Sequence, residues 1–184
     1  MILIPQWRMM KVREKSEATK EEIQLVSFKI GKETFAVYVN QVREIGRVEE
    51  ITHVPNMPEF IEGVMDLRGQ ITTVIDLRRR FGIMEKVERT DRSRIIVAEI
   101  DNNQMGIIVD SVQDVIRISP DVISPPPEVV SKTIDARLLT GVCRMEKELV
   151  MLLDLNNLFS EGEKEDLHTM QQDKIVKNKA KTEV

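Results

Sequence analysis

The amino-acid sequence predicts an all-β fold made of two similar small β-barrels, each of about five strands. Two observations support this prediction. Short runs rich in β-branched residues are joined by turn-forming residues, and much of this pattern occurs twice along the 184-residue chain. Hydrophobic residues make up 41% of the chain and aromatic residues only 4%, so we expect aliphatic cores. Short helical turns are expected between some of the strands.

Four β-hairpins are expected in chain order, each with a short turn between two β-forming runs. The turns centre on Gly31, Arg68-Gly69, Asp101-Asn102 and Glu146-Lys147. No long helical pattern separates the runs, which argues against parallel βαβ units. The paired runs are 24–30 with 34–39, 63–67 with 70–75, 93–100 with 104–109, and 141–145 with 149–153.

An internal duplication relates the two halves of the chain. Residues 36–45 align without gaps on residues 106–115, an offset of 70 (36 to 106). Further along, Gly63 aligns on Gly141, an offset of 78 (63 to 141), so the second copy holds extra residues in or after the proline-rich stretch 125–127. The duplication shows that the repeats have similar content. It leaves open whether strands are exchanged between them.

The chain divides into a core and two polar tails. We place a flexible N-terminal extension at 1–21, a first repeat at about 22–83 and a second at about 92–159. Residues 160–184 form a charged C-terminal tail, for which a marginal helix and a solvated segment are both open interpretations. Because the tails are polar and have no counterpart in the repeat, we expect both to be dispensable for folding.

Composition limits the cellular setting. No run approaches the ~18 apolar residues of a transmembrane helix, and the apolar opening is stopped at Pro5, too early for a signal peptide. The net charge of -4 favours neither nucleic acid nor an anionic membrane. A single cysteine, Cys143, excludes an intrachain disulfide, and we interpret it as a buried small hydrophobic residue. We therefore expect a soluble, cytoplasmic protein without membrane insertion.

The residues predict no catalytic, cofactor-binding or metal-binding set. The two histidines, His53 and His168, belong to no cluster with metal-ligand spacing. Asp76 and Asp154 are equivalent in the two repeats, and each follows a strand and precedes a short helical stretch. We interpret both as helix caps rather than as a general acid and base, because capping explains their repetition.

Two groups of arginines suggest different roles. Arg78-Arg79-Arg80 is the densest basic cluster, and we interpret it as a solvated helical face. A nucleic-acid site would be expected to interleave aromatic residues with the cations, yet a small-barrel nucleic-acid binder remains the rival function. Arg68 lies in a tight turn before Gly69. It is either an ordinary exposed turn residue or a bidentate contact for a partner carboxylate.

Several segments together resemble the CheW family of coupling proteins. The most recognisable is Phe60-Ile-Glu-Gly-Val-Met-Asp-Leu-Arg-Gly69, followed by Val74-Ile-Asp-Leu-Arg78. The closing Leu149-Val-Met-Leu-Leu-Asp-Leu155 is similar as well. The resemblance covers roughly 22–159 with its motifs in order, which makes it specific. Asp66 departs from the pattern, since this family usually has Asn before Leu-Arg-Gly.

The resemblance implies two five-stranded, SH3-like barrels and a non-catalytic role without cofactors. Such an adaptor couples the cytoplasmic tips of methyl-accepting chemoreceptors to the regulatory domain of a CheA-type histidine kinase. It would be cytoplasmic and recruited to membrane-associated receptor arrays. A CheV-like adaptor is an alternative, although the chain has no fused receiver domain.

The resemblance also implies which residues meet the two partners. Val42, Gly63 and Arg68 match positions associated with the receptor surface, whereas Glu44 and Ile45 match positions associated with kinase binding. Gly63 would let a partner helix approach closely, and Ile45 would supply apolar contact area unless it packs in the core. We expect the two surfaces to be separable, so that Arg68→Glu affects only the receptor and Glu44→Lys only the kinase.

Overall fold

The computed structural model describes residues 21–83 and 88–169. Most of the predicted N-terminal extension and the end of the predicted C-terminal tail lie outside these residues. The described chain is mostly β, as expected. Its helical elements are α1 (Leu77–Arg80), α2 (Glu128–Thr133), the 3₁₀ turns η1 (Val39–Gln41), η2 (Pro120–Val122) and η3 (Leu155–Asn157), and a helix over 161–169.

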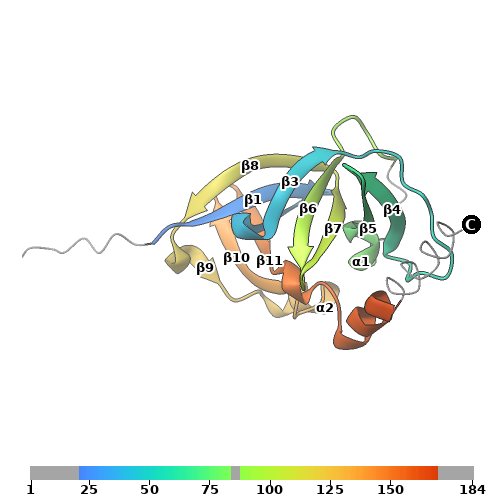
Figure 1. The fold of residues 1–184 in the computed structure, drawn as a ribbon. Helices are drawn as coiled ribbons and strands as arrows, with labels where there is room; N and C mark the ends of the chain where they lie inside the picture. Colours follow the sequence, from blue (N-terminus) through green and yellow to red (C-terminus); the bar gives the residue numbers. More distant parts are fainter. Residues whose placement is uncertain (1–20, 84–87, 170–184) are drawn as a thin grey trace, which may run out of the picture.

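The strands fall into two sets of similar order (Figure 1). The first repeat supplies β1 (Ile23–Ile30), β2 (Glu33–Tyr38), β3 (Val42–Arg47), β4 (Ile61–Leu67) and β5 (Gln70–Asp76). The second supplies β6 (Arg94–Ile100), β7 (Asn103–Val109), β8 (Ser111–Ile118), β9 (Ile123–Ser124), β10 (Leu139–Met145) and β11 (Glu148–Leu153).

All four predicted hairpins are present, each closed by a two-residue turn. Arg68 and Gly69 have φ values of 52° and 84°, and Asp101 and Asn102 have 49° and 63°. Positive φ at both central residues is typical of type I′ turns, whose twist matches that of the flanking strands. Glycine adopts this conformation without strain, and aspartate and asparagine tolerate it better than most residues.

The repeats exchange strands. One sheet has the order β8-β1-β2-β11-β10-β9 and the other has the order β3-β6-β7-β5-β4. Each sheet therefore combines the first hairpin of one repeat with the later strands of the other. Parallel pairs join the two contributions, β11 with β2 and β5 with β7. The duplication is exact in register here, since Val74 pairs with Gly106 as Leu152 pairs with Ala36.

The expected closure of each sheet into a barrel is not confirmed. Within the described residues, one sheet ends at β8 and β9 and the other at β3 and β4. In the five-stranded sheet, the chain after β3 returns to β4 through a single isolated bridge between Thr52 and Val64. The segment between β3 and Thr52 forms no strand ladder. Each sheet therefore has two edge strands and is not closed within the described residues.

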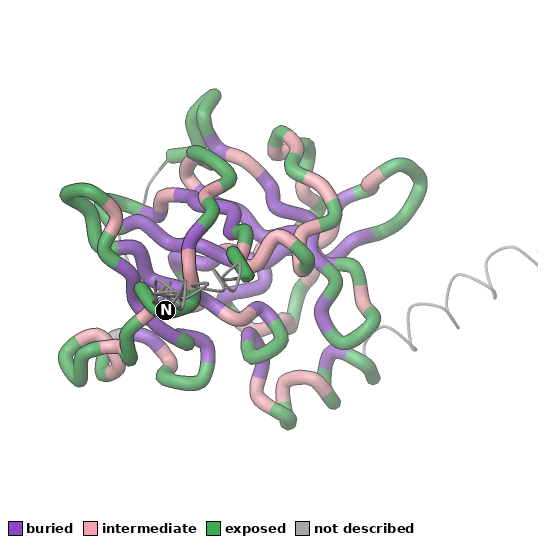
Figure 2. The backbone as a smooth tube through the Cα atoms, turned by 90° about the vertical axis from the view of Figure 1, so that its left-hand side faces the viewer, coloured by how far each residue is buried: buried purple, intermediate pink, exposed green. Residues whose placement is uncertain are grey.

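Buried side chains form one large cluster and two small ones. The large cluster draws on both sheets and includes stacked rings, Phe28 with Phe35 and Phe35 with Phe81. A small cluster around Leu152 belongs to the six-stranded sheet, and one around Val74 to the five-stranded sheet. Figure 2 shows the buried backbone gathered in the middle of the molecule, with exposed turns around it. The cores are largely aliphatic, as predicted.

Candidate functional site

Two of the predicted partner residues are bonded to each other. Nη2 of Arg68, in the β4–β5 turn, donates to Oε1 of Glu44 on β3 at 2.9 Å. β3 and β4 are the two edges of the same sheet, so this ion pair spans the edges. The Arg68 side chain is 78% exposed, whereas that of Glu44 is 29% exposed. The two predicted surfaces therefore meet at one point.

The turn that presents Arg68 is fixed by its own residues. Leu67 pairs with Gln70, which leaves Arg68 and Gly69 as the two turn residues. Oδ1 of Asp66 accepts a hydrogen bond from the Gly69 backbone N–H at 2.6 Å. The amide oxygen of an asparagine is able to accept the same bond, so Asp66 keeps the turn despite its departure from the family pattern.

β3 displays Ile45 at an edge of its sheet. A β-bulge lies between Val42 and Glu44, after which Glu44 lies opposite Val97 and Ile45 opposite Ile96. Ile45 is 40% exposed, so part of its side chain packs against neighbours and part is open to solvent. The equivalent residue of the second repeat, Val115, is 50% exposed. Exposure at this position is therefore a property of the repeated strand.

Val42 and Gly63 are less exposed than Arg68 and Ile45. Val42 is half-buried and packs against the large cluster. Gly63 is buried with φ of 152°, and a Cβ there would lie 2.2 Å from the backbone oxygen of Thr52. In the structure, the close approach that requires glycine is thus made by its own chain at Thr52, and the approach of a partner helix stays a prediction. Assignment of these residues to the receptor surface stays a prediction.

The arginine cluster is not the solvated face that the sequence suggested. Arg78 is buried, and its guanidinium forms an ion pair with Asp110, with Nε to Oδ1 at 2.9 Å. Arg79 lies 3.3 Å from a carboxylate oxygen of Glu62. Since these cations bind carboxylates of the same chain, the cluster no longer supports a nucleic-acid site.

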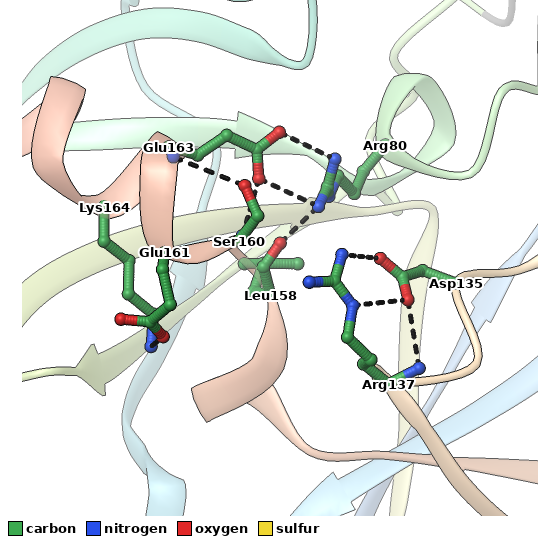
Figure 3. Close-up of polar contacts among 8 residues, drawn as sticks. All are labelled: Arg80, Asp135, Arg137, Leu158, Ser160, Glu161, Glu163 and Lys164. Carbon is green, nitrogen blue, oxygen red and sulfur yellow. Dashed lines mark hydrogen bonds and ion pairs between the residues drawn. The ribbon is translucent and has the colours of Figure 1, made fainter.

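Arg80 joins the two sheets (Figure 3). Its Nη1 and Nη2 donate to the two carboxylate oxygens of Glu163, each at 3.2 Å, and its Nε donates to the carbonyl of Leu158 at 2.9 Å. Its guanidinium carbon lies 4.7 Å from the centre of the Phe60 ring. Arg80 follows β5 and its polar partners follow β11. These bonds therefore connect the segment after a strand of the five-stranded sheet to the segment after a strand of the six-stranded sheet.

The two predicted caps and the cysteine are confirmed. Oδ1 of Asp76 accepts from the backbone N–H of Arg78, and Oδ1 of Asp154 accepts from that of Asn156. Burial raises the pKa of the Asp76 carboxyl, and the hydrogen bond from Arg78 opposes that rise. Cys143 is buried, which raises the pKa of its thiol.

Neither a metal site nor a membrane span is found in the part of the chain that the structure describes. Among residues 21–83 and 88–169, no group of three or more histidines, cysteines or carboxylates is placed to hold a metal ion. Within the same ranges, no helix is both long and apolar enough to cross a bilayer.

The Glu44–Arg68 ion pair could not be predicted from the sequence. The two residues are 24 positions apart and lie on opposite edges of a sheet whose strand order was unknown. Opposite charges at such a spacing are common in any chain with 32% charged residues. A prediction of strand exchange together with sheet order would have been needed to find it.

The chain is similar to known proteins over most of its length. The CheW-like domain model matches residues 24–163. The probable chemotaxis protein CheW of Rhizobium etli is 35% identical over 142 residues, 77% of this chain and 90% of that protein. The chemotaxis protein CheW of Bacillus subtilis is 35% identical over 132 residues, 72% of this chain and 83% of that protein.

A solved structure is similar as well. The scaffolding protein TtCheW from Thermoanaerobacter tengcongensis superposes with a TM-score of 0.69 and 38% identity, over 75% of this chain and 88% of that one. The chemotaxis protein CheV3 of Helicobacter pylori is 30% identical over 149 residues, but these make up only 48% of that protein. The match to CheV3 is thus to one part of a longer chain.

Proposed function

The chain belongs to the CheW-like domain family, and from this premise we propose that it couples chemoreceptor cytoplasmic tips to a CheA-type histidine kinase. Its role as a chemotaxis adaptor follows from the family and from the relatives, which are named as chemotaxis and scaffolding proteins. Such a role is non-catalytic. The protein acts by binding, at the membrane-associated arrays to which its partners recruit it.

The Glu44–Arg68 ion pair is the observation that supports this proposal most directly. Arg68 is held at the tip of a rigid turn, where its planar guanidinium is able to bind a receptor carboxylate through two hydrogen bonds. A receptor carboxylate at Arg68 competes with Glu44 for the same donors. Binding at the receptor position therefore changes the charge environment at the kinase position, which links the two partners.

This arrangement changes the expectation that the surfaces are separable. An exposed ion pair of this kind contributes about 0.2–1 kcal/mol, so a receptor carboxylate can displace it at little cost. Arg68→Glu removes the partner of Glu44 and places a like charge beside it, so it disturbs both positions. We now expect Arg68→Glu to weaken receptor binding most, by about 2 kcal/mol, and to weaken kinase binding to a smaller extent.

A charge-swap series tests the proposal. Receptor cytoplasmic fragment and kinase regulatory domain are each titrated against Arg68→Glu, Glu44→Arg and the double variant. The double variant restores the internal ion pair with reversed polarity, so any binding defect that persists in it reports a direct contact between that charge and the partner. Arg144→Glu, an exposed arginine on β10 of the other sheet, is the control. Receptor binding that stays within twofold of the parent in Arg68→Glu would remove Arg68 from the receptor surface.

A further inference from the structure

Two arginines lie directly opposite each other where β3 and β6 pair. The register of this antiparallel pair places Arg47 of β3 against Arg94 of β6. Residues directly opposite in an antiparallel ladder point to the same face, with Cβ atoms about 5 Å apart. Like charges in this arrangement destabilise the pair. The protein therefore carries an electrostatic cost at this edge of the five-stranded sheet.

No carboxylate of the described residues forms an ion pair with either arginine. Nη1 of Arg94 donates to the backbone carbonyls of Asp91 and Ser93, at 2.7 and 2.8 Å. By contrast, seven arginines of the described chain have carboxylate partners: Arg43, Arg68, Arg78, Arg79, Arg80, Arg89 and Arg137.

Other arginines on strands avoid this conflict. Arg117 lies opposite Gln24, and Arg144 lies opposite Leu149, so neither faces a like charge across its ladder. The juxtaposition of Arg47 and Arg94 is thus particular to the edge of β3. A bound anion between the two guanidinium groups would turn the repulsion into attraction.

The two arginines line a cleft. Its volume is about 490 Å³, and it lies beside the chain segments that follow β3 and precede β6. The hydroxyl-bearing residues Thr90 and Ser93 also line it. Arg89 also lines the cleft, but its Nη2 forms an ion pair with Oε1 of Glu62 at 2.6 Å. Among the described residues of the cleft, the arginines without a carboxylate partner are therefore those of the opposed pair.

We propose that this cleft binds a carboxylate side chain from an acidic segment of a partner protein. The planar fork of a guanidinium matches a carboxylate through two parallel hydrogen bonds. Glu49 and Asp91 also line the cleft, and their charges repel a ligand with several closely spaced negative charges, such as a nucleic-acid backbone. A single carboxylate meets the two arginines without that penalty.

The position of Arg47 indicates which partner supplies the carboxylate. Ile45 and Arg47 are two residues apart on β3 and both are exposed, so they point to the same face of the strand. The cleft continues the surface to which the kinase regulatory domain is assigned, and this step rests on the proposed function.

A stability measurement tests the electrostatic premise without any partner. Arg47→Glu places a carboxylate opposite Arg94, so at low ionic strength we expect Tm to rise by about 2–4 °C, with a smaller rise for Arg47→Gln. The difference from the parent should shrink in 1 M NaCl, where the screening length is about 3 Å. Arg43→Gln, on the same strand as Arg47, removes an ion pair with Glu99 of β6 and should not raise Tm. An unchanged or lower Tm in Arg47→Glu would show that the pair is not repulsive and would overturn the inference.

A binding measurement tests the ligand. Arginine Nε–H resonances are followed by NMR while a peptide with a single glutamate among uncharged residues, or inorganic phosphate at matched ionic strength, is added. We expect the peptide to shift Arg47 and Arg94 selectively and Arg47→Glu to abolish the Arg94 shift. A larger response to phosphate, or no selective response, would overturn the assignment to an acidic segment. Titration with kinase regulatory domain should then show at least fivefold weaker binding for Arg47→Glu than for Arg43→Gln. Failure of the parent to bind that domain would instead reject the proposed function, while the peptide result would stand.

Discussion

At the scale of single residues, two glycines show how the duplicated backbone is built. Gly63 on β4 and Gly141 on β10 are equivalent in the repeats, and the strand pairing is irregular beside both. A Cβ at Gly63 would meet the backbone of Thr52 at 2.2 Å, whereas a Cβ at Gly141 would meet a side-chain methyl of Ile123 at 2.5 Å. A backbone oxygen held in a β-bridge cannot move away as a side chain can. Gly63 should therefore tolerate an added methyl group less well than Gly141.

Gly63→Ala is therefore expected to destabilise the protein by about 3 kcal/mol, and Gly141→Ala by about 1–2 kcal/mol. Gly63 also has φ of 152°, which L-residues rarely adopt, and this adds to its cost. The measurement is urea unfolding followed by circular dichroism. Gly162→Ala is the control, because Gly162 lies in the helix over 161–169 with open space around it and should gain stability. Equal losses at Gly63 and Gly141 would contradict the backbone argument.

Residue roles that depend on neighbours in sequence were predictable. The caps Asp76 and Asp154 bond to backbone two residues away, and the motif alone indicated this. Arg78 and Arg80 were misinterpreted, because their partners are 32 and 83 positions away. A triplet of arginines predicts solvation unless the fold is known to bring carboxylates to it.

At the scale of elements, the helix over 161–169 is more than a polar continuation of the chain. Ser160 and Glu163 form a capping box: the Ser160 N–H donates to Oε2 of Glu163 at 2.7 Å, and the Glu163 N–H donates to the Ser160 hydroxyl at 3.3 Å. Leu167 is 5% exposed and belongs to the large cluster. Lys164 reaches Asp101 in the β6–β7 turn at 3.1 Å. The helix therefore packs against the sheet to which its own strand does not belong.

Ending the chain at Phe159 is now expected to cost more than about 2 kcal/mol, contrary to the expectation that the tail is dispensable. The truncation uncovers the site of Leu167 and leaves Arg80, a side chain only 15% exposed, without its carboxylate. Chemical unfolding of the truncated and full chains gives the comparison. Glu163→Ala should reproduce about half of the loss, and Glu165→Ala, exposed on the same helix, should be nearly neutral. A truncated chain as stable as the parent would show that the docked helix contributes nothing.

The four hairpins were predictable because turn residues and alternating apolar residues act locally. The docking of the C-terminal helix was not, because its stretch from Glu161 to Thr169 contains a single buried side chain. A lone leucine among charged residues is also typical of a solvated tail. The contacts that distinguish the two, with Arg80 and Asp101, come from segments far away in the sequence.

At the scale of the whole molecule, strand exchange makes the two repeats interdependent. The small cluster around Val74 combines β4 and β5 of the first repeat with β6 and β7 of the second. The small cluster around Leu152 combines β1 and β2 of the first repeat with later strands of the second. Neither repeat holds a complete core of its own, which answers the question of strand exchange that the duplication left open.

Val74→Asp and Leu152→Asp are accordingly expected to unfold the whole chain in each case, rather than one half. Both side chains are buried, at 0% and 1% exposure. An unpaired carboxylate in such a site costs several kcal/mol, which is comparable with the entire stability of a typical domain. Because each cluster contains strands of both repeats, loss of one cluster removes partners from both sheets.

Amide hydrogen exchange resolved by residue provides the measurement for this pair of variants. In both, protection should be lost together in β1, which the first repeat supplies to the six-stranded sheet, and in β6, which the second supplies to the five-stranded sheet. Ile71→Asp is the control, because Ile71 lies on the same strand as Val74 but is 66% exposed, and it should leave protection unchanged. If Val74→Asp abolished protection in 22–83 while 92–159 stayed protected, the repeats would be independent folding units. The exchange of strands would then have no energetic consequence.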